Sequence, residues 1–265
     1  MSANTHGTGT YEWADANYNV GIGCRNNCRY CYAASKAARY KKRARERWQE
    51  EVVKDPLPQI PQGAPKTIMF PSAHDITPAY LDVAVTSIDA LLRAGHRLLI
   101  VSKPQLVIVD ELCRSLTDCG DWREKVLFRF SIGSSNPKLM AYWEPDAPCL
   151  AERLAALELA KARHFQTSVS MEPLLGGRDD ALCTVARVES LVTEKIWIGR
   201  MNKVLARVNP QTEEEREACR RVMKAQSDEE MMLLMQDLRR HPKIEWKDSI
   251  KQLLCRLPGQ SVTTP

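Results

Sequence analysis

The chain has 265 residues, of which 44% are hydrophobic and 27% are charged, and its formal net charge is +5 at pH 7. These proportions are those of an ordinary soluble globular protein, and no apolar run approaches the roughly 20 residues that a membrane-spanning helix needs. The first residues have neither the basic start nor the apolar stretch of a secretory signal. We therefore expect a cytoplasmic protein that does not cross a membrane, with its nine cysteines reduced.

The first notable feature along the chain is a cluster of three cysteines, Cys24, Cys28 and Cys31, which follows a weak strand pattern between residues 11 and 23. A basic stretch comes next, and it comprises Lys36, Arg39, Lys41, Lys42, Arg43, Arg45 and Arg47. Such a run of charges is usually a solvated helix face. The alternative is a patch that faces phosphate groups, which the mildly basic composition favours.

Five strand-like runs rich in Ile, Val, Leu and Phe follow. After each of the first four comes a longer segment whose apolar residues recur at helical spacing. The strands are predicted at residues 66–72, 96–104, 125–135, 166–175 and 195–200, and the helices at 77–95, 105–120, 149–164 and 180–192. Thr77 is expected to cap the first of these helices and Gly95 to end it. With the weak first strand, six strand–helix units predict an α/β fold, a parallel sheet forming a partial (β/α)6 TIM-like barrel.

The character of the sequence changes after Asn209. We predict a barrel domain of residues 1–205, which carries the cysteine loop at 24–31, and a C-terminal helical extension of residues 206–265 packed on it. In the extension, TEEEREACRRVMKAQ, DEEMMLLMQDLRRH and PKIEWKDSIKQLLC are each predicted to be helical. The proline-rich residues 55–65 are expected to form a non-helical linker.

The number of clustered cysteines distinguishes two kinds of metal site. A structural zinc ion is usually closed by four ligands, and no second CxxC pair exists in the chain. A cubane iron–sulfur cluster binds one cysteine at each iron, so three cysteines leave one iron open. The segment CRNNCRYC, with Tyr30 before its last cysteine, resembles the motif of the radical S-adenosylmethionine (radical SAM) enzymes.

This resemblance implies a 4Fe-4S cluster on Cys24, Cys28 and Cys31, with S-adenosylmethionine chelated to the open iron. It also implies an oxygen-sensitive enzyme in which the reduced cluster cleaves S-adenosylmethionine to a 5′-deoxyadenosyl radical that abstracts hydrogen from a substrate. The electron would come from a flavodoxin- or ferredoxin-like protein, or from a chemical reductant. The active site of such a barrel lies at the carboxyl ends of its strands.

Polar residues gather after the predicted strands, and the resemblance gives several of them a role. CRYCYA, SKP and FRFSIGSS are similar to the branch that contains spore photoproduct lyase. In that branch a lysine and a serine hold the methionine carboxylate, and these match Lys103 and Ser131. The other residues expected at the cofactor are Asp75, Ser134, Glu172 and Gly199.

Some of these residues also have a structural interpretation. Lys103 could be a surface lysine at a strand end, and Asp75 could cap the helix that begins near Thr77. Glu172 follows apolar strand residues, so its carboxylate needs a partner such as Lys103, Arg129 or a ligand hydroxyl.

The sequence also departs from the family pattern. PSAHD stands where many members carry the Gly-Gly-Glu run that meets the methionine amine, and no cysteine matches the hydrogen donor of the photoproduct lyase. We therefore do not expect repair of thymine photodimers, although the basic stretch favours a nucleic acid or nucleotide as substrate. The alternative function is a non-catalytic zinc- or cluster-binding module whose basic helix docks nucleic acid or a protein partner.

Overall fold

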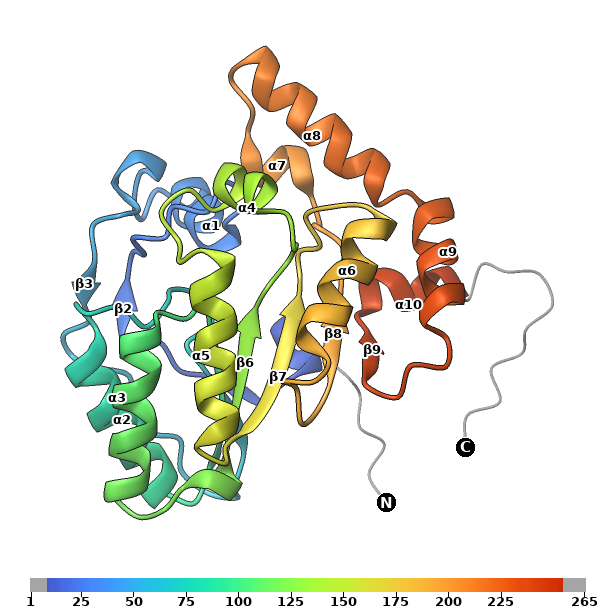
Figure 1. The fold of residues 1–265 in the computed structure, drawn as a ribbon. Coiled ribbons are helices and arrows are strands. Elements are labelled where there is room, and N and C mark those ends of the chain that lie inside the picture. The colour runs from blue at the N-terminus through green and yellow to red at the C-terminus, as the bar shows by residue number, and fades with distance from the viewer. Residues whose placement is uncertain (1–8, 255–265) are drawn as a thin grey trace.

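The computed structural model describes residues 9–254. Its centre is a seven-stranded sheet in which every pair of neighbouring strands is parallel (Figure 1). In spatial order the strands are β1 (Ala16–Asn17), β4 (Thr67–Phe70), β5 (Arg97–Ser102), β6 (Val126–Ser131), β7 (Gln166–Met171), β8 (Ile196–Ile198) and β9 (Ile244–Trp246). A separate antiparallel ribbon consists of β2 (Gly21–Ile22) and β3 (Val52–Val53).

Helices flank the sheet because parallel strands need long crossover connections. Four helices lie along one face of the sheet (Figure 1): α2 (Leu81–Arg93), α3 (Leu106–Asp118), α5 (Leu150–Ala162) and α6 (Arg178–Val188). Four others lie beyond the carboxyl ends of the strands (Figure 1): α1 (Tyr32–Arg39), α4 (Pro137–Trp143), α7 (Val204–Val208) and α8 (Glu213–Ala225). The last two are α9 (Asp228–Leu238) and α10 (Asp248–Leu254). None of the helices in residues 9–254 combines the length and the apolar character that a membrane span requires.

The two faces of the sheet have different chemistry. Along β6, Phe128 and Phe130 are fully buried on one face, where the Phe128 ring lies 5.3 Å from that of Phe165. Arg129 and Ser131 alternate with them and point to the opposite face. The sheet thus buries aromatic residues under the helices and carries polar side chains on its inner side.

The barrel is open between its two edge strands. The order of the described strands begins with β1 and ends with β9, and no pairing joins these two. Side chains close part of the gap: Lys247, just after β9, forms an ion pair at 2.9 Å with Glu12, which precedes β1. The Trp13 and Trp197 rings meet edge to face with their centroids 5.8 Å apart. The fold is therefore the partial barrel that the sequence predicts.

Most predicted elements are confirmed, two predictions are wrong, and the helices α4 and α7 are not predicted. Ile244–Trp246 is strand β9 and not part of a helix, so the C-terminal segment contributes a strand to the same sheet as the barrel. Helix α2 begins at Leu81, with Tyr80 as its N-cap residue, rather than at Thr77. Helix α4 is not predicted, although Asn136 caps it through hydrogen bonds from two backbone N–H groups. The division into domains at residue 205 stays a prediction.

Candidate active site

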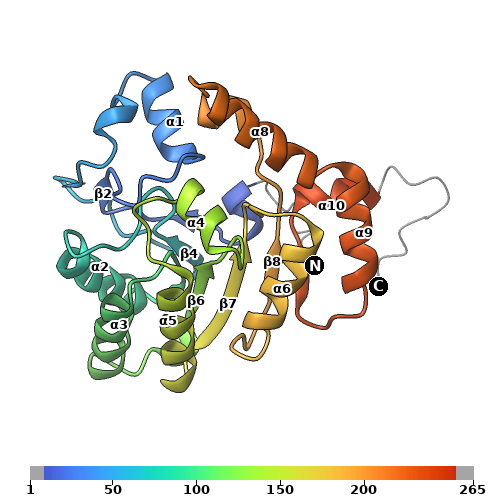
Figure 2. The same ribbon diagram turned by 45° about the horizontal axis from the view of Figure 1, so that its top comes forward.

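The three cysteines lie on the loop that joins β2 to α1, beyond the carboxyl ends of the strands (Figure 2). Cys24 and Cys28 are buried, and Cys31 is the half-buried N-cap residue of α1. Gly23 turns the chain into this loop with a φ of +95°, and a Cβ atom there would lie 2.1 Å from the Glu50 carbonyl oxygen. Only glycine fits at this position.

The thiols of the loop influence one another electrostatically. Burial is the main cause that raises the pKa of Cys24, and the charges of Asp75, Cys28 and Cys31 raise it further. Burial also raises the pKa of Cys28 to about 12. Within residues 9–254, no three His, Cys, Asp or Glu side chains converge as the ligands of one metal ion. A cubane cluster does not require three side chains to meet at one metal ion, because each thiolate binds a different iron atom.

Two buried N–H groups beside the cysteine loop have no hydrogen-bond partner, namely Nε1 of Trp48 and Nη1 of Arg45. Trp48 packs against Cys24, and Arg45 donates from Nη2 to the backbone oxygen of Cys28 at 2.6 Å. Buried donors without acceptors are unfavourable, and the sulfur atoms of an iron–sulfur cluster accept such hydrogen bonds. Three thiols on one loop with unpartnered donors beside them fit a 4Fe-4S cluster.

Asp75 connects the cysteine loop to the end of β5. Its buried carboxylate accepts hydrogen bonds from Nδ2 of Asn26 at 2.7 Å and from the Ser102 hydroxyl at 2.5 Å. The backbone N–H groups of Ile76 and Lys103 also donate to it, at 2.8 and 2.9 Å. Burial raises the pKa of Asp75, while these hydrogen bonds oppose the change. The Asp75 side chain therefore connects the cysteine loop to the end of β5, and it does not cap α2.

Lys103 directs its ammonium toward the cysteine loop from the end of β5. Burial alone would lower the pKa of Lys103, but the charges of Cys28, Tyr30 and Glu144 raise it well above its usual value. Nζ lies 3.8 Å from Oε1 of Glu144 and 5.6 Å from the centre of the Tyr30 ring. Among the described residues no acceptor lies within hydrogen-bond distance of this nitrogen. Lys103 is thus not a surface lysine, because its side chain is only 17% exposed.

Glu144 and Arg153 form a buried ion pair behind Lys103. Their closest atoms are 2.5 Å apart and both side chains are 1% exposed. Tyr30 donates its hydroxyl to Glu144, and Nη1 of Arg153 donates to the backbone oxygen of Ser131 at 2.9 Å. Burial would raise the pKa of Glu144, but the positive charges of Arg153 and Lys103 outweigh it and lower the pKa. The network ties the ends of β5 and β6 to the cysteine loop.

Ser131 and Ser134 differ in what they contact. Ser131 is the half-buried last residue of β6, on the polar inner side of the sheet. Ser134 is fully buried, and its hydroxyl accepts a hydrogen bond from the backbone N–H of Asn136 at 2.9 Å. The Ser134 hydroxyl thus organises the turn that leads into α4.

Glu172 and Gly199 lie together on the other side of the barrel mouth. Glu172 pairs with Lys247 at 3.5 Å, and among the described residues it forms no ion pair with Lys103 or Arg129, two of the three partners that the sequence suggests. Burial raises the pKa of Glu172. A Cβ atom on Gly199 would lie 2.9 Å from Lys247 and 3.0 Å from Glu172, so the chain passes close to both.

Sequence reasoning missed Glu144, Arg153 and Lys247. Glu144 follows α4, and Arg153 is a charged residue on α5, where the sequence resembles that of a solvent-exposed helix. No pattern marks either residue, because neither follows a strand. Lys247 comes directly after β9, so recognising that strand would have placed it at the barrel mouth.

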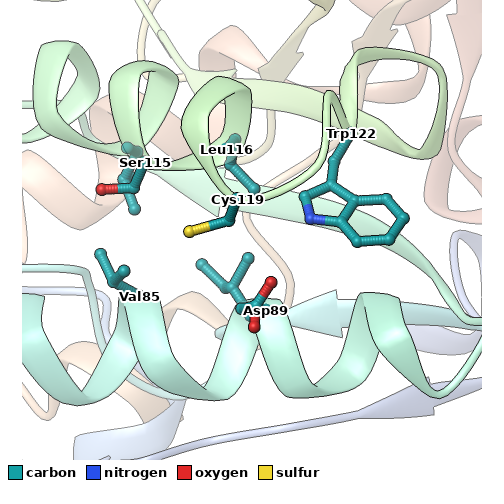
Figure 3. A pocket seen from close by; sticks show the side chains of 8 residues that line it. Val85, Asp89, Ser115, Leu116, Cys119 and Trp122 are labelled. Atoms are coloured by element: carbon teal, nitrogen blue, oxygen red, sulfur yellow. The ribbon is translucent and has the colours of Figure 1, made fainter.

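A small crevice between α2 and α3 lies on the outer face, away from the cysteine loop (Figure 3). Its volume is about 10 Å³, which is too small for a cofactor. The side chains labelled around it are Val85, Asp89, Ser115, Leu116, Cys119 and Trp122.

Known proteins support this assignment of the cysteine loop. The family model of the radical SAM superfamily matches residues 18–183. The fold is similar to that of SuiB from Streptococcus suis bound to S-adenosylmethionine, with a TM-score of 0.51, 10% sequence identity, and coverage of 87% of this chain and 49% of SuiB. A second SuiB structure gives a TM-score of 0.52 at 10% identity, with 94% and 53% covered.

The chain thus spans about half the length of SuiB, and at this identity the likeness concerns the fold alone. No curated protein matches the chain. The match to the family model covers more than half of the sequence and contains the three clustered cysteines. The protein therefore belongs to the radical SAM superfamily.

Proposed function

We propose that the protein is a radical SAM enzyme that cleaves S-adenosylmethionine reductively and uses the resulting radical to abstract hydrogen from a nucleic acid or nucleotide. The observation that carries the cofactor assignment is the ammonium of Lys103. It is nearly buried, it is influenced by the charge of Cys28, and none of the described residues accepts a hydrogen bond from it. A carboxylate ligand beside the cluster would supply that acceptor.

Each residue around the cysteine loop then has a separate task. Lys103 and Ser131 would hold the methionine carboxylate, since both lie at the carboxyl ends of neighbouring strands. The Glu144–Arg153 pair would position Lys103, because Oε1 of Glu144 lies 3.8 Å from the Lys103 ammonium and Arg153 pairs with the same carboxylate. When bound, the reduced cluster supplies the electron that cleaves S-adenosylmethionine to the 5′-deoxyadenosyl radical.

The substrate class is proposed from the basic stretch and from the similarity of CRYCYA, SKP and FRFSIGSS to the spore photoproduct lyase branch. Four of its exposed cations form no ion pair with a described residue, namely Lys36, Arg39, Lys41 and Lys42. The others have structural contacts: Arg43 and Arg45 donate to backbone oxygens, and Arg47 pairs with Glu50. A nucleic acid on the exposed cations would bind with a steep dependence on salt.

We further propose a cytoplasmic enzyme that receives its electron from a flavodoxin- or ferredoxin-like protein, because an oxygen-sensitive cluster needs a reducing compartment. Family membership does not favour the alternative of a non-catalytic zinc module.

The test is anaerobic reconstitution with iron and sulfide, followed by dithionite, S-adenosylmethionine and quantification of 5′-deoxyadenosine. We expect about four irons and four sulfides per chain and formation of the product. Ala substitutions at Cys24, Cys28 or Cys31 should abolish both, whereas Cys149→Ala, at an exposed cysteine, should change neither. A colourless protein with one zinc ion, or product formation by any of the three Ala variants, would overturn the proposal.

A further inference from the structure

A second cavity lies at the opposite end of the sheet from the cysteine loop. Its volume is about 180 Å³. Thr67, Arg97 and Gln166 line it, and they are the first residues of β4, β5 and β7. Lys103 and Glu172, by contrast, follow the last residues of β5 and β7. The cavity is therefore separate from the proposed cofactor site, which lies at the carboxyl ends of the same strands.

The cavity has an excess of positive charge. Three cations line it, Arg97, Lys125 and Arg129, and no carboxylate does. None of the three forms an ion pair with another described residue: Arg97 donates to the backbone oxygen of Glu124, and the Lys125 ammonium lies 5.1 Å above the Trp122 ring. An opposite charge from a ligand would therefore be favourable here.

Arg129 is the most deeply placed of these cations, with only 5% of its surface exposed. Its guanidinium lies against two indole rings that contact each other, 4.7 Å from the centre of Trp13 and 5.1 Å from that of Trp197. Nε donates to the Ser168 hydroxyl at 3.0 Å, while Nη1 has no partner. Burial lowers the pKa of Arg129 to about 9, and the charge of Glu172 offsets only part of this effect.

Other polar side chains line the cavity beside Arg129. Nε1 of Trp13 is also buried without a partner, and Trp13 lines the same cavity. Gln166 and Thr67 add polar side chains at the rim, and Leu99 and Leu127 supply apolar wall. The volume exceeds the roughly 150 Å³ of an engineered cavity that holds benzene, so a small ligand fits.

We infer that this cavity binds a phosphate group, either as inorganic phosphate or on a small organic molecule, between Arg97, Lys125 and Arg129. Three unpaired cations match a dianion better than a single carboxylate, and arginine presents paired donors to phosphate oxygens. The inference does not depend on the radical chemistry, because none of the three cations is among the residues proposed to hold the cluster or S-adenosylmethionine.

The experiment is calorimetric titration of the full chain with inorganic phosphate and, separately, with glycerol phosphate, at constant ionic strength. We expect at least one of the two probes to bind, and their relative affinities show whether the group is free or esterified. The rim double variant Arg97→Gln with Lys125→Gln should bind about tenfold more weakly or worse. Arg129→Met should lose binding as well.

The control removes the same charge elsewhere: Lys138→Gln with Lys224→Gln, both exposed, should leave the affinity unchanged. The rim variant keeps the test informative if Arg129→Met does not fold, since Arg97 is an exposed residue at the start of its strand. Absence of binding by both probes, or equal binding by wild type and rim variant, would overturn the inference. So would loss of binding in the control variant alone.

Discussion

Asn26 donates a hydrogen bond of 2.7 Å to the buried carboxylate of Asp75. Asn26 lies between Cys24 and Cys28, while Asp75 also accepts from the backbone N–H of Lys103. One carboxylate thus fixes the cysteine loop relative to the proposed cofactor-binding lysine. The distance between the cysteine thiols and the Lys103 ammonium therefore depends on Asp75. In our proposal Asp75 contacts neither the cluster nor the methionine group.

Asp75→Asn should weaken this connection, because an amide nitrogen would face N–H groups that now donate to a carboxylate oxygen. Unsatisfied buried donors cost about 1–3 kcal/mol. We expect a loss of that size in the free energy of unfolding by urea, together with fewer irons per chain after reconstitution. Asp82→Asn, at an exposed residue of α2, is the matched control. Unchanged stability and iron content in Asp75→Asn would contradict this role.

The Glu144 ion pair should make stability depend on pH. The pKa of Glu144 is lowered in the folded protein, so its contribution is complete above the usual glutamate value of 4.5 and is lost as the pH falls through the lower, folded value. At pH 7, Glu144→Gln should cost about 3–5 kcal/mol because the buried charge of Arg153 loses its carboxylate partner. Urea unfolding at several pH values should show this difference shrinking below about pH 4.

The control for that measurement is Glu158→Gln, at an exposed position of α5, which should leave stability unchanged across the same range. A Glu144→Gln deficit that is equally large at acid and neutral pH would mean that the carboxylate charge is not what stabilises the site.

Lys103→Met should weaken binding of S-adenosylmethionine without removing the cluster. Loss of a hydrogen bond to a charged group costs about 1.5–3 kcal/mol, which corresponds to roughly a tenfold to hundredfold higher Kd. Titration of cluster-loaded protein would measure it, with Lys138→Met, at an exposed residue of α4, for comparison. An unaltered Kd at equal iron content would exclude Lys103 from the cofactor site.

Trp48→Phe should lower the reduction potential of the cluster. The unpartnered indole N–H beside Cys24 would stabilise the more negative, reduced cluster by donating to its sulfur atoms. A hydrogen bond worth about 1 kcal/mol corresponds to roughly 40 mV for one electron. A redox titration followed by electron paramagnetic resonance would detect it. Trp122→Phe removes an equally unpartnered indole N–H next to the α2–α3 crevice and should have no effect.

The fold was largely predictable because its strands are apolar runs, and they alternate with helices in which apolar residues recur at regular spacing. Ile244–Trp246 was mistaken for helix because a three-residue strand shows no period of its own, and its position is decided by pairing with β8. The first strand pattern was similarly too short to reveal that Ala16–Asn17 and Gly21–Ile22 belong to different sheets.

The site could be predicted only where a short stretch of sequence identifies the functional residue by itself. The cysteine motif and the position of Lys103 at a strand end could be read directly from the sequence. The partners of these residues could not, since Glu144 reaches Lys103 across 41 residues and Asn26 reaches Asp75 across 49. Such contacts depend on the tertiary structure, which is why Glu172 pairs with Lys247, a residue that is not among the partners suggested by the sequence.

The most direct test of the radical SAM assignment is the electron paramagnetic resonance spectrum of the dithionite-reduced protein before and after S-adenosylmethionine is added. A cluster held by Cys24, Cys28 and Cys31 alone has an open iron, so we predict that the cofactor alters the spectrum of the cluster and that S-adenosylhomocysteine, which lacks the sulfonium, yields no 5′-deoxyadenosine. A reduced cluster whose spectrum does not respond to S-adenosylmethionine would contradict the account.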